Sequence, residues 1–444
     1  MQIHLSENFT YNKLLRFVMP SVMMMVFTSL YGIVDGLFVS NFVGKTAFAS
    51  INFIMPFLMI LGTIGFMIGA GGSATIAKTL GEGCKDKANR HFSMLIYTTI
   101  ITGIVFTIIG IIFIEPIARL LGADGQMLGD CVEYGTIILC ALTFFMLQNV
   151  FQSFLVTAEK PHLGLYVTVA AGVTNMILDY ILIVPLKMGV AGAAVATATS
   201  QAVGGLVPLI YFAGKNNTSL LRLTKAAADF KTLAKVCTNG SSELMTNISM
   251  SLVNMIYNFQ LMRFEGKDGI AAFGVIMYVN WIFVSIFIGY SIGSAPIVGY
   301  NYGAKNTGEL KNILKKSIVI LFSAGIALTV ISIAFARPLA GIFIGYDNAL
   351  LNLTEHGLKL FSLAFTLCGF NIYGSAFFTA LNNGFISAVI SFMRTFVFQA
   401  AVVIILPIFF KTDGIWFSLI VSEMLAFIVA AALVFIKNKD YNYM

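Results

Sequence analysis

The sequence predicts an all-α membrane protein with about twelve transmembrane helices, arranged as two parallel six-helix repeats around a central cavity. Composition is the first observation behind this prediction: the 444 residues are 58% hydrophobic and only 11% charged, with 40 Phe and 21 Met. A soluble domain of this length cannot bury so much apolar surface, so lipid is the expected solvent. The regular recurrence of apolar runs and an internal repeat are the second and third observations.

Apolar runs long enough to cross a bilayer recur along the whole chain. The first six cover residues 14–40, 47–77, 92–114, 131–157, 163–184 and 190–213, and six more cover residues 236–262, 270–300, 313–335, 354–380, 385–410 and 415–436. A polar and basic stretch separates the two sets. We therefore expect an N lobe at 1–213, an inter-lobe linker at 214–235 and a C lobe at 236–444.

Basic residues gather in alternate segments between these runs. They are Lys78, Lys85, Lys87 and Arg90; Lys215, Arg222, Lys225, Lys231 and Lys235; Lys305, Lys311, Lys315 and Lys316; and Lys437 and Lys439. The opposite loops are poor in Lys and Arg, and one carries Glu115, Asp124 and Asp130. The positive-inside rule therefore places both termini in the cytoplasm. The net charge of +7 fits loops beside an anionic leaflet, so no nucleic-acid partner is expected.

An internal repeat emerges when the sequence is shifted by 222 residues, the offset between Gly44 and Gly266. The same shift pairs Gly71 with Gly293, Gly81 with Gly303, Pro116 with Pro338, Glu133 with Glu355, Asn149 with Asn371 and Pro185 with Pro407. Each half holds six spans, so both halves run in the same direction, related by an axis along the membrane normal. That arrangement is typical of transporters. A duplicated scaffold without a transport role is the alternative.

Four acidic residues stand out well inside the apolar runs: Asp35, Asp179, Glu243 and Glu423. Each costs about 2.5–3.5 kcal/mol at the centre of a span on insertion scales, so each requires a reason. The repeat aligns them with non-acidic residues, namely Tyr257, Ala401, Ser21 and Gln201. The scaffold was duplicated while the acids were not, so packing requirements of the fold do not explain them.

Two of these acids are expected to meet in the outer half of the membrane. Asp35 and Asp179 lie late in outward-running spans, and Thr197 lies early in an inward-running one. At about 1.5 Å of rise per helical residue, these positions place all three residues in the outer half of the membrane. Asn175 shares a helix face with Asp179, one turn away. These oxygen ligands suit a hard cation such as Na⁺. The two carboxylates could instead share a proton, or each acid could bond only a neighbouring helix.

The remaining polar features have two interpretations each. Glu243 and Glu423 are either a second acidic site or structural. Arg394 is the only basic residue well inside an apolar run; it either snorkels or pairs with an acid, and we expect a structural role. Pro20 either kinks the first span or is tolerated near a helix start. The five cysteines show no paired spacing, so neither a disulfide framework nor a metal site is expected.

Three segments carry a family resemblance. They are residues 33–39 (IVDGLFV) followed by Gly44, residues 80–83 (LGEG) at the end of a Gly-rich second span, and residues 296–305 (PIVGYNYGAK) at the equivalent place in the second half. The chain resembles the multidrug and toxic compound extrusion (MATE) family, and more narrowly its bacterial MepA-like branch. The resemblance covers nearly the whole chain, and the YNYGAK segment is its most specific part.

The resemblance implies a secondary active antiporter of a bacterial inner membrane, which exports cationic or amphipathic compounds in exchange for Na⁺ or H⁺. The family's N-half ion site falls on Asp35, Asn175, Asp179 and Thr197, and its bending proline falls on Pro20. Some members add a C-half site with a Glu in the seventh span and an Asp in the tenth. Glu243 matches the first, but the tenth span has only neutral polar residues beyond Glu355, so that site is incomplete.

Other functions fit the sequence less well than export. A flippase for lipid-linked sugars could share the helix arrangement but needs a more cationic cavity, for which Arg394 is the one candidate. An intramembrane enzyme is disfavoured because His4, His91, His162 and His356 lie in tails, loops or span ends, without metal or nucleophile spacing. A channel is also less consistent with the sequence, because acids that occur in only one half fit a coupling site better than a symmetric pore. We expect a monomer in lipid with no cofactor besides the coupling ion.

Overall fold

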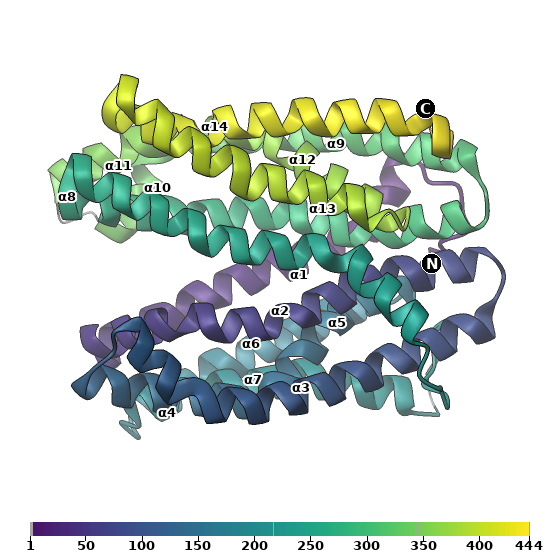
Figure 1. Ribbon diagram of the computed structural model, residues 1–444, viewed down its shortest axis with the longest axis horizontal. Coiled ribbons are helices and arrows are strands. Elements are labelled where there is room, and N and C mark those ends of the chain that lie inside the picture. Colours follow the sequence, from purple (N-terminus) through teal and green to yellow (C-terminus); the bar gives the residue numbers. More distant parts are fainter. Residues whose placement is uncertain (1–2, 216, 345–346, 444) are drawn as a thin grey trace.

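A computed structural model describes residues 3–215, 217–344 and 347–443, and within these ranges it contains helices but no strand (Figure 1). The α-helices are α1 (Tyr11–Phe38), α2 (Lys45–Gly81), α3 (Lys85–Leu121), α4 (Gly125–Cys140), α5 (Leu142–Thr157), α6 (Pro161–Ile183), α7 (Gly189–Ala213), α8 (Phe230–Gly303), α9 (Thr307–Ala334), α10 (Ala336–Ile344), α11 (Asn348–Phe361), α12 (Phe365–Ala380), α13 (Gly384–Phe392) and α14 (Gln399–Tyr441). Three short helices of other types interrupt them: η1 (Val39–Val43), η2 (Ser362–Ala364) and η3 (Met393–Phe398).

Local sequence explains where many helices begin. Side-chain oxygens of Thr10, Asp229, Asn306, Asp347 and Asn383 accept hydrogen bonds from backbone N–H groups in the first turns of α1, α8, α9, α11 and α13. Such caps satisfy N–H groups that a helix cannot pair internally. Between the caps the segments are apolar, and a helix is the conformation that satisfies every backbone group within lipid.

The described helices provide twelve crossings, which confirms the predicted fold class. Nine helical units are long and apolar enough to span a membrane, and α4 with α5, which meet at 55°, make a tenth. Two of these units are too long for a single crossing, since about 20 residues suffice. The longer one, α8, breaks at Gly266 (φ 64°, ψ −143°), and α14 breaks at Lys411 (φ 50°, ψ −130°). The short helix α10 was not predicted.

The backbone carries the same repeat as the sequence. Gly44 and Gly266 both have positive φ and each ends the first span of its half. Gly189 and Lys411, also 222 residues apart, both have positive φ before the last span of each half. Glycine adopts this conformation freely. Lys411 adopts the same positive φ although a residue with a side chain rarely does so.

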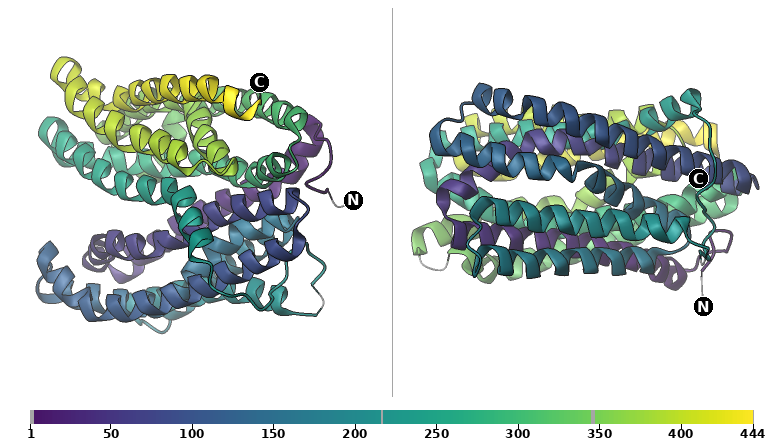
Figure 2. Two further views of the ribbon diagram at one scale, coloured as in Figure 1. Left: turned by 45° about the vertical axis from the view of Figure 1, so that its right-hand side comes forward. Right: turned by 90° about the horizontal axis from the view of Figure 1, so that it is seen from below.

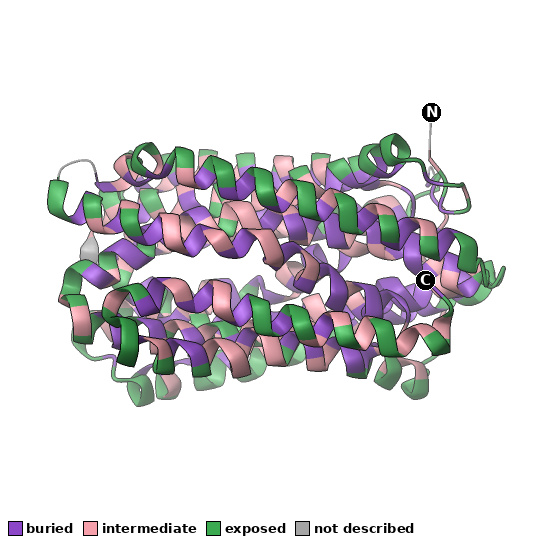
Figure 3. Cartoon of the chain, turned by 90° about the horizontal axis from the view of Figure 1, so that it is seen from above, coloured by how far each residue is buried: buried purple, intermediate pink, exposed green. Residues whose placement is uncertain are grey.

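The helices gather into two bundles, which we call the N bundle (α1–α7) and the C bundle (α8–α14) (Figure 1). Both termini lie at one end of the molecule, which we call the basic end because Lys78, Lys85 and Lys305 lie there. Figure 2 shows, in its left view, that the bundles lie close together at this end and diverge toward the other. Exposed residues are frequent on the outer helices of the C bundle, which lies nearest the viewer in Figure 3, as expected for a surface that contacts lipid.

Glycines let the two bundles touch backbone to backbone at the basic end. A Cβ atom added to Gly81 would overlap the carbonyl oxygen of Tyr300, and one added to Gly303 would overlap that of Lys78. The two contacts are related by the 222-residue repeat, so equivalent residues of α2 and α8 make the same contact twice. Small residues at such crossings are typical of membrane helices, which associate through close packing.

The N-terminal segment ties the bundles together at the same end. The backbone N–H of Leu5 donates to Glu159 Oε1 at 2.7 Å, and His4 Nδ1 lies 2.7 Å from Glu159 Oε2. The backbone N–H of Phe9 donates to Glu309 Oε1 at 2.9 Å. Since Glu159 belongs to the N bundle and Glu309 to the C bundle, residues 4–9 bridge the two.

The predicted linker, 214–235, is more ordered than its polar composition indicated. The N–H of Arg222 donates to Asn89 Oδ1 at 2.9 Å, and the N–H of Thr224 donates to Ser93 Oγ at 2.8 Å. Leu221 is fully buried against the N bundle. Side chains on the buried face of α3 therefore hold the linker backbone in place.

Asp229 connects this docked segment to α8 and forms hydrogen bonds with both α3 and α8. Its N–H donates to Met94 Sδ at 3.2 Å, while its carboxylate accepts from the N–H groups of Lys231 and Thr232 at 3.1 Å. Hydrogen bonds from Thr232 hold the pKa of the Asp229 carboxyl below its usual range. Helix α8 therefore begins at Phe230, and the last six residues of the predicted linker belong to it.

The orientation can be tested at Cys84, which is exposed at the basic end. We expect an impermeant thiol reagent to leave Cys84 unlabelled in intact cells and to label it in opened membranes, because Lys-rich and Arg-rich loops stay inside. The test uses a variant in which the other cysteines are replaced by serine.

A matched control places a cysteine at the other end of the same helix. Leu120, at the far end of α3, is 86% exposed, so Leu120→Cys in a chain without other cysteines should be labelled in intact cells. Labelling of Cys84 from outside, or protection of position 120, would reverse the orientation.

Candidate functional site

Three adjacent helices of the N bundle position the predicted ion-binding residues. Asp35 lies near the end of α1, while Asn175 follows Gly172 by one turn on α6. A Cβ atom on Gly172 would lie 2.5 Å from the ring of Phe27 and 2.9 Å from that of Tyr31. Glycine at this position therefore lets α1 pack its aromatic rings directly against α6.

The structure brings all four predicted residues together. The Asp35 carboxylate lies close enough to interact with the side chains of Asp179, Asn175 and Thr197. Asp179 and Asn175 are 0% and 1% exposed. Helix α7 supplies Thr197 and packs against α6, so the cluster joins α1, α6 and α7.

The polar atoms of this cluster have few partners in the protein. Asp35 Oδ1, both oxygens of Asp179, both amide atoms of Asn175 and Thr197 Oγ1 are buried without a hydrogen-bond partner. Leaving a buried polar atom unpaired costs about 1–3 kcal/mol. These side chains therefore face one another without well-formed hydrogen bonds, and their oxygens can accept a further ligand.

Such a donor set fits a small hard cation or a shared proton. Carboxylate, amide and hydroxyl oxygens are ligands that Na⁺ accepts, and two adjacent carboxylates resist ionising together. Among the residues that the structure describes, no group of three or more His, Cys, Asp or Glu side chains could hold a metal ion. The cluster therefore differs from a transition-metal site.

One further member of the cluster escaped sequence analysis. Tyr134 on α4 is 1% exposed and lies beside Thr197, within electrostatic range of Asp35 and Asp179. Its position depends on the packing of α4 against α7. No charge or repeat in the sequence indicated this tyrosine.

The two residues of the predicted second acidic site occupy separate environments. Arg394 Nη2 lies 2.8 Å from Glu423 Oε1, and Asn371 Nδ2 donates to Glu423 Oε2 at 2.6 Å. Glu423 is thus the acid that pairs with Arg394. The Glu243 carboxylate is half-buried and forms no ion pair with any residue in the described ranges. A second acidic site at Glu243 and Glu423 stays a prediction.

Glu243 lies next to a close contact between the two bundles. One turn earlier on α8, a Cβ atom on Gly240 would overlap the carbonyl oxygen of Met67 on α2. Glu243 follows this crossing on the side away from the basic end. Its carboxylate is therefore near the interface between bundles rather than inside one of them.

Pro20 lies in a continuous helix at another inter-bundle contact. Helix α1 keeps helical geometry through Pro20, which is buried. A proline lacks the N–H that would bond four residues back, so the helix is weaker there. The next two residues, Ser21 and Val22, pack against Gly289 of α8, where a Cβ atom would lie 2.5 Å from Val22 Cα. The hinge at Pro20 stays a prediction.

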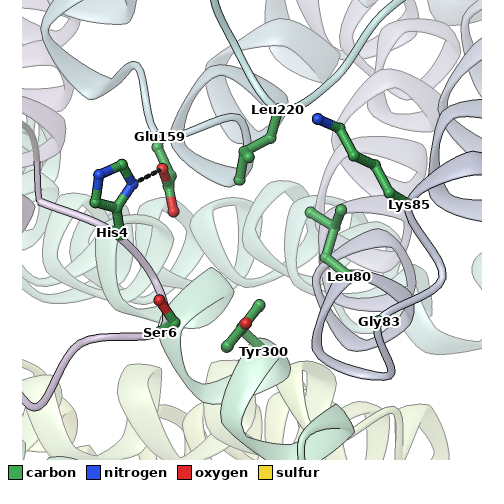
Figure 4. A pocket seen from close by; sticks show the side chains of 8 residues that line it. All are labelled: His4, Ser6, Leu80, Gly83, Lys85, Glu159, Leu220 and Tyr300. Atoms are coloured by element: carbon green, nitrogen blue, oxygen red, sulfur yellow. Dashed lines mark hydrogen bonds and ion pairs between the residues drawn. The ribbon is translucent and has the colours of Figure 1, made fainter.

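A cavity of about 220 Å³ at the basic end is a second place to consider (Figure 4). It is lined by His4, Ser6, Leu80, Gly83, Lys85, Glu159, Leu220 and Tyr300. Both carboxylate oxygens of Glu159 already bind the N-terminal segment. The cavity is therefore part of the contact that closes this end.

Comparison with known proteins places these observations in a family context. The MatE family model matches residues 20–181 and, separately, residues 244–405, one match in each half. The multidrug export protein MepA of Staphylococcus saprophyticus subsp. saprophyticus is 25% identical over 441 residues, covering 98% of this chain and 95% of that protein. The protein of the same name from Staphylococcus aureus strain MRSA252 is 24% identical over 429 residues, covering 96% and 94%.

Solved structures share the fold over nearly the full length. A MATE structure in complex with MaL6 matches with a TM-score of 0.93 at 23% identity and covers 98% of each chain. The outward-facing conformation of a multidrug resistance MATE family transporter matches with a TM-score of 0.93 at 22% identity, again over 98% of each chain.

The stability of the protein tests whether the acid cluster is structural. We expect Asp179→Asn to raise the free energy of unfolding by about 1–3 kcal/mol, because it removes a buried charge without hydrogen-bond partners. Thermal unfolding of the purified protein in detergent measures this. The control is Asp124→Asn, at an exposed position, which should change little. A lower unfolding temperature for Asp179→Asn than for the control would show that the carboxylate holds helices together.

Proposed function

Because this chain belongs to the MatE family of membrane transporters, we propose that it is a secondary active antiporter, which exports cationic or amphipathic organic compounds in exchange for Na⁺ or H⁺. The observation that carries this proposal is the buried cluster of Asp35, Asn175, Asp179 and Thr197, whose polar atoms lack partners in the protein. The multidrug export proteins that match the whole chain support the substrate class.

An ion drives export only if it binds one conformation better than another. Three helices build the cluster, and one of them, α1, also contacts the other bundle. On α1, Val22 packs against Gly289, and Ser29 Oγ lies 3.4 Å from the carbonyl oxygen of Trp281. Ion binding at Asp35 would therefore act on a helix that forms the inter-bundle contact.

The arrangement of the bundles supports alternating access. They touch at the basic end, through Gly81, Gly303 and the N-terminal segment, and diverge at the other (Figure 2). In the proposed cycle this outward-opening form releases substrate. Bending of α1 at Pro20 when the cluster binds its ion would then alter the surface that faces substrate. The protein would lie in a bacterial inner membrane, with the basic end and both termini on the cytoplasmic side.

Glu243 supports a preference for cationic compounds. Its carboxylate has no basic partner in the described chain and lies beside the α2–α8 crossing. A half-buried acid between the bundles attracts a positively charged substrate more strongly than one exposed to water.

Transport in proteoliposomes decides the coupling ion. Purified protein is reconstituted, and export of a fluorescent cation is followed while a Na⁺ or an H⁺ gradient is imposed separately. We expect one of the two gradients to drive export. If export were as fast without any gradient as with a Na⁺ or an H⁺ gradient, antiport would be contradicted.

The coupling role of the cluster predicts a specific defect. We expect Asp35→Asn and Asp179→Asn each to keep normal abundance and substrate binding but to lose gradient-driven export by roughly 10-fold or more, a size typical of coupling free energies. The double variant should be little worse than either single variant, since both act through one site. Uptake into inverted vesicles, normalised to protein, measures this. Wild-type rates in both single variants would refute the N-bundle site.

Because Glu243 stands alone, we expect its substitution to impair export less than substitution of the clustered acids. We expect Glu243→Gln to reduce gradient-driven export less than Asp35→Asn does, because Glu243 has no acidic partner with which to hold an ion. The comparison uses the same vesicles, with Glu243→Asp as the charge-preserving control. Complete loss in both Glu243→Gln and Asp35→Asn would indicate that the C bundle also takes part in coupling.

A further inference from the structure

The C bundle holds no copy of the N-bundle acid cluster. At the positions related by the 222-residue repeat, Tyr257 replaces Asp35 and Ala401 replaces Asp179. The fold is duplicated, so these two positions fall at matching places on matching helices. The C bundle therefore has the equivalent space but different chemistry within it.

That space is filled by the protein itself. The Tyr257 hydroxyl lies 2.6 Å from Ser418 Oγ, and both groups are buried. The Tyr257 ring stacks on Phe273 with ring centroids 4.9 Å apart and an interplanar angle of 10°. An aromatic ring and a satisfied hydroxyl thus occupy the place where the N bundle presents unpaired carboxylates.

The buried acid of the C bundle, Glu423, already has a cation. Arg394 Nη2 lies 2.8 Å from Glu423 Oε1, and Arg394 Nε lies 2.9 Å and 3.1 Å from the two carboxylate oxygens. Asn371 donates to the same carboxylate at 2.6 Å, and Arg394 Nη2 also reaches Cys368 Sγ at 3.2 Å. Glu423 is 3% exposed and the Arg394 side chain 16%. A full set of protein partners thus surrounds this carboxylate.

The two bundles therefore differ in how they balance buried charge. In the N bundle, Asp35 and Asp179 form no ion pair with any residue that the structure describes, and Asp35 Oδ1 and both oxygens of Asp179 are buried without a well-formed hydrogen bond. In the C bundle, Glu423 has a guanidinium, which stays charged at every physiological pH. A carboxylate that must exchange ions during transport cannot keep such a partner throughout.

We propose that Arg394 is a fixed counter-cation, which takes the place of a coupling ion at Glu423, so that Glu423 takes no part in coupling and the exchangeable ion binds in the N bundle. This inference rests on the proposed function, because it presupposes a coupling ion. Arg394 is in these terms a positioning residue, and its role is to keep the C bundle from binding an ion at Glu423.

The number of coupling cations bound per protein tests the proposal. Radioactive Na⁺ binding and proton uptake are measured on purified full-length protein. We expect Arg394→Gln/Glu423→Gln to bind as many cations as wild type. Its export should stay within about twofold of wild type, because replacing both members of a buried ion pair by neutral groups is often close to neutral. Asp35→Asn/Asp179→Asn should bind none at this site.

Single variants sharpen the comparison. Arg394→Gln leaves Glu423 buried without a counter-charge, so we expect it to bind one cation more than wild type and to unfold at a temperature that depends on Na⁺ or pH. Arg394→Lys keeps a fixed positive charge and should keep the wild-type number of bound cations. A purely structural arginine would change stability in Arg394→Gln but leave the cation count unchanged, which would contradict the proposal.

Two results would overturn the inference. One is the loss of a bound cation in Arg394→Gln/Glu423→Gln. The other is a cation that remains bound when Glu243→Gln is added to Asp35→Asn/Asp179→Asn. This triple variant leaves the ion pair between Arg394 and Glu423 intact. The measurement therefore decides the question even if the variants of the ion pair fail to fold. Failure of the proposed function looks different, because the wild type would then bind no exchangeable cation or Asp35→Asn/Asp179→Asn would still export.

Discussion

The crossing of α2 and α8 at the basic end is the contact on which the arrangement of the molecule depends. Lipid is as apolar as a leucine side chain, so helices in a bilayer associate through close packing instead of through release of water. Glycine at positions 81 and 303 removes the side chain at the contact and lets backbone meet backbone. Because equivalent residues make this contact twice, it holds the bundles together at the basic end in this structure, while they diverge at the other end.

Much of the fold could be predicted because lipid restricts the backbone to a few solutions. The bounds of the twelve crossings fall within seven residues of the apolar runs, and the 222-residue offset recurs in the positive φ angles of Gly44 and Gly266. The docking of the linker could not be predicted. Its composition is basic and polar, and only tertiary contact shows that Leu221 is buried and that Asn89 and Ser93 bind its backbone.

The sequence indicated which residues along each helix lie at a similar level, but not how the helices are rotated toward one another. Residue numbers and a helical rise place Asp35 and Asp179 at one level, and in the structure their carboxyl groups lie close enough to interact; ion binding there stays a prediction. How each helix is rotated about its own axis depends on packing that no single sequence displays. For this reason the pairing of Arg394 with Glu423, rather than with Glu243, and the presence of Tyr134 beside the acids became visible only in three dimensions.

The joint at Asp229 limits how the two bundles can move. Its N–H is held by Met94 on α3, while its carboxylate caps α8 one residue later, so no slack chain lies between the docked segment and the helix. Such a connection permits rotation about the backbone torsions of residues 229 and 230 but hardly any translation. The segment between the bundles is therefore a short corner anchored on α3 and on the first turn of α8, and it contains no loose connecting chain.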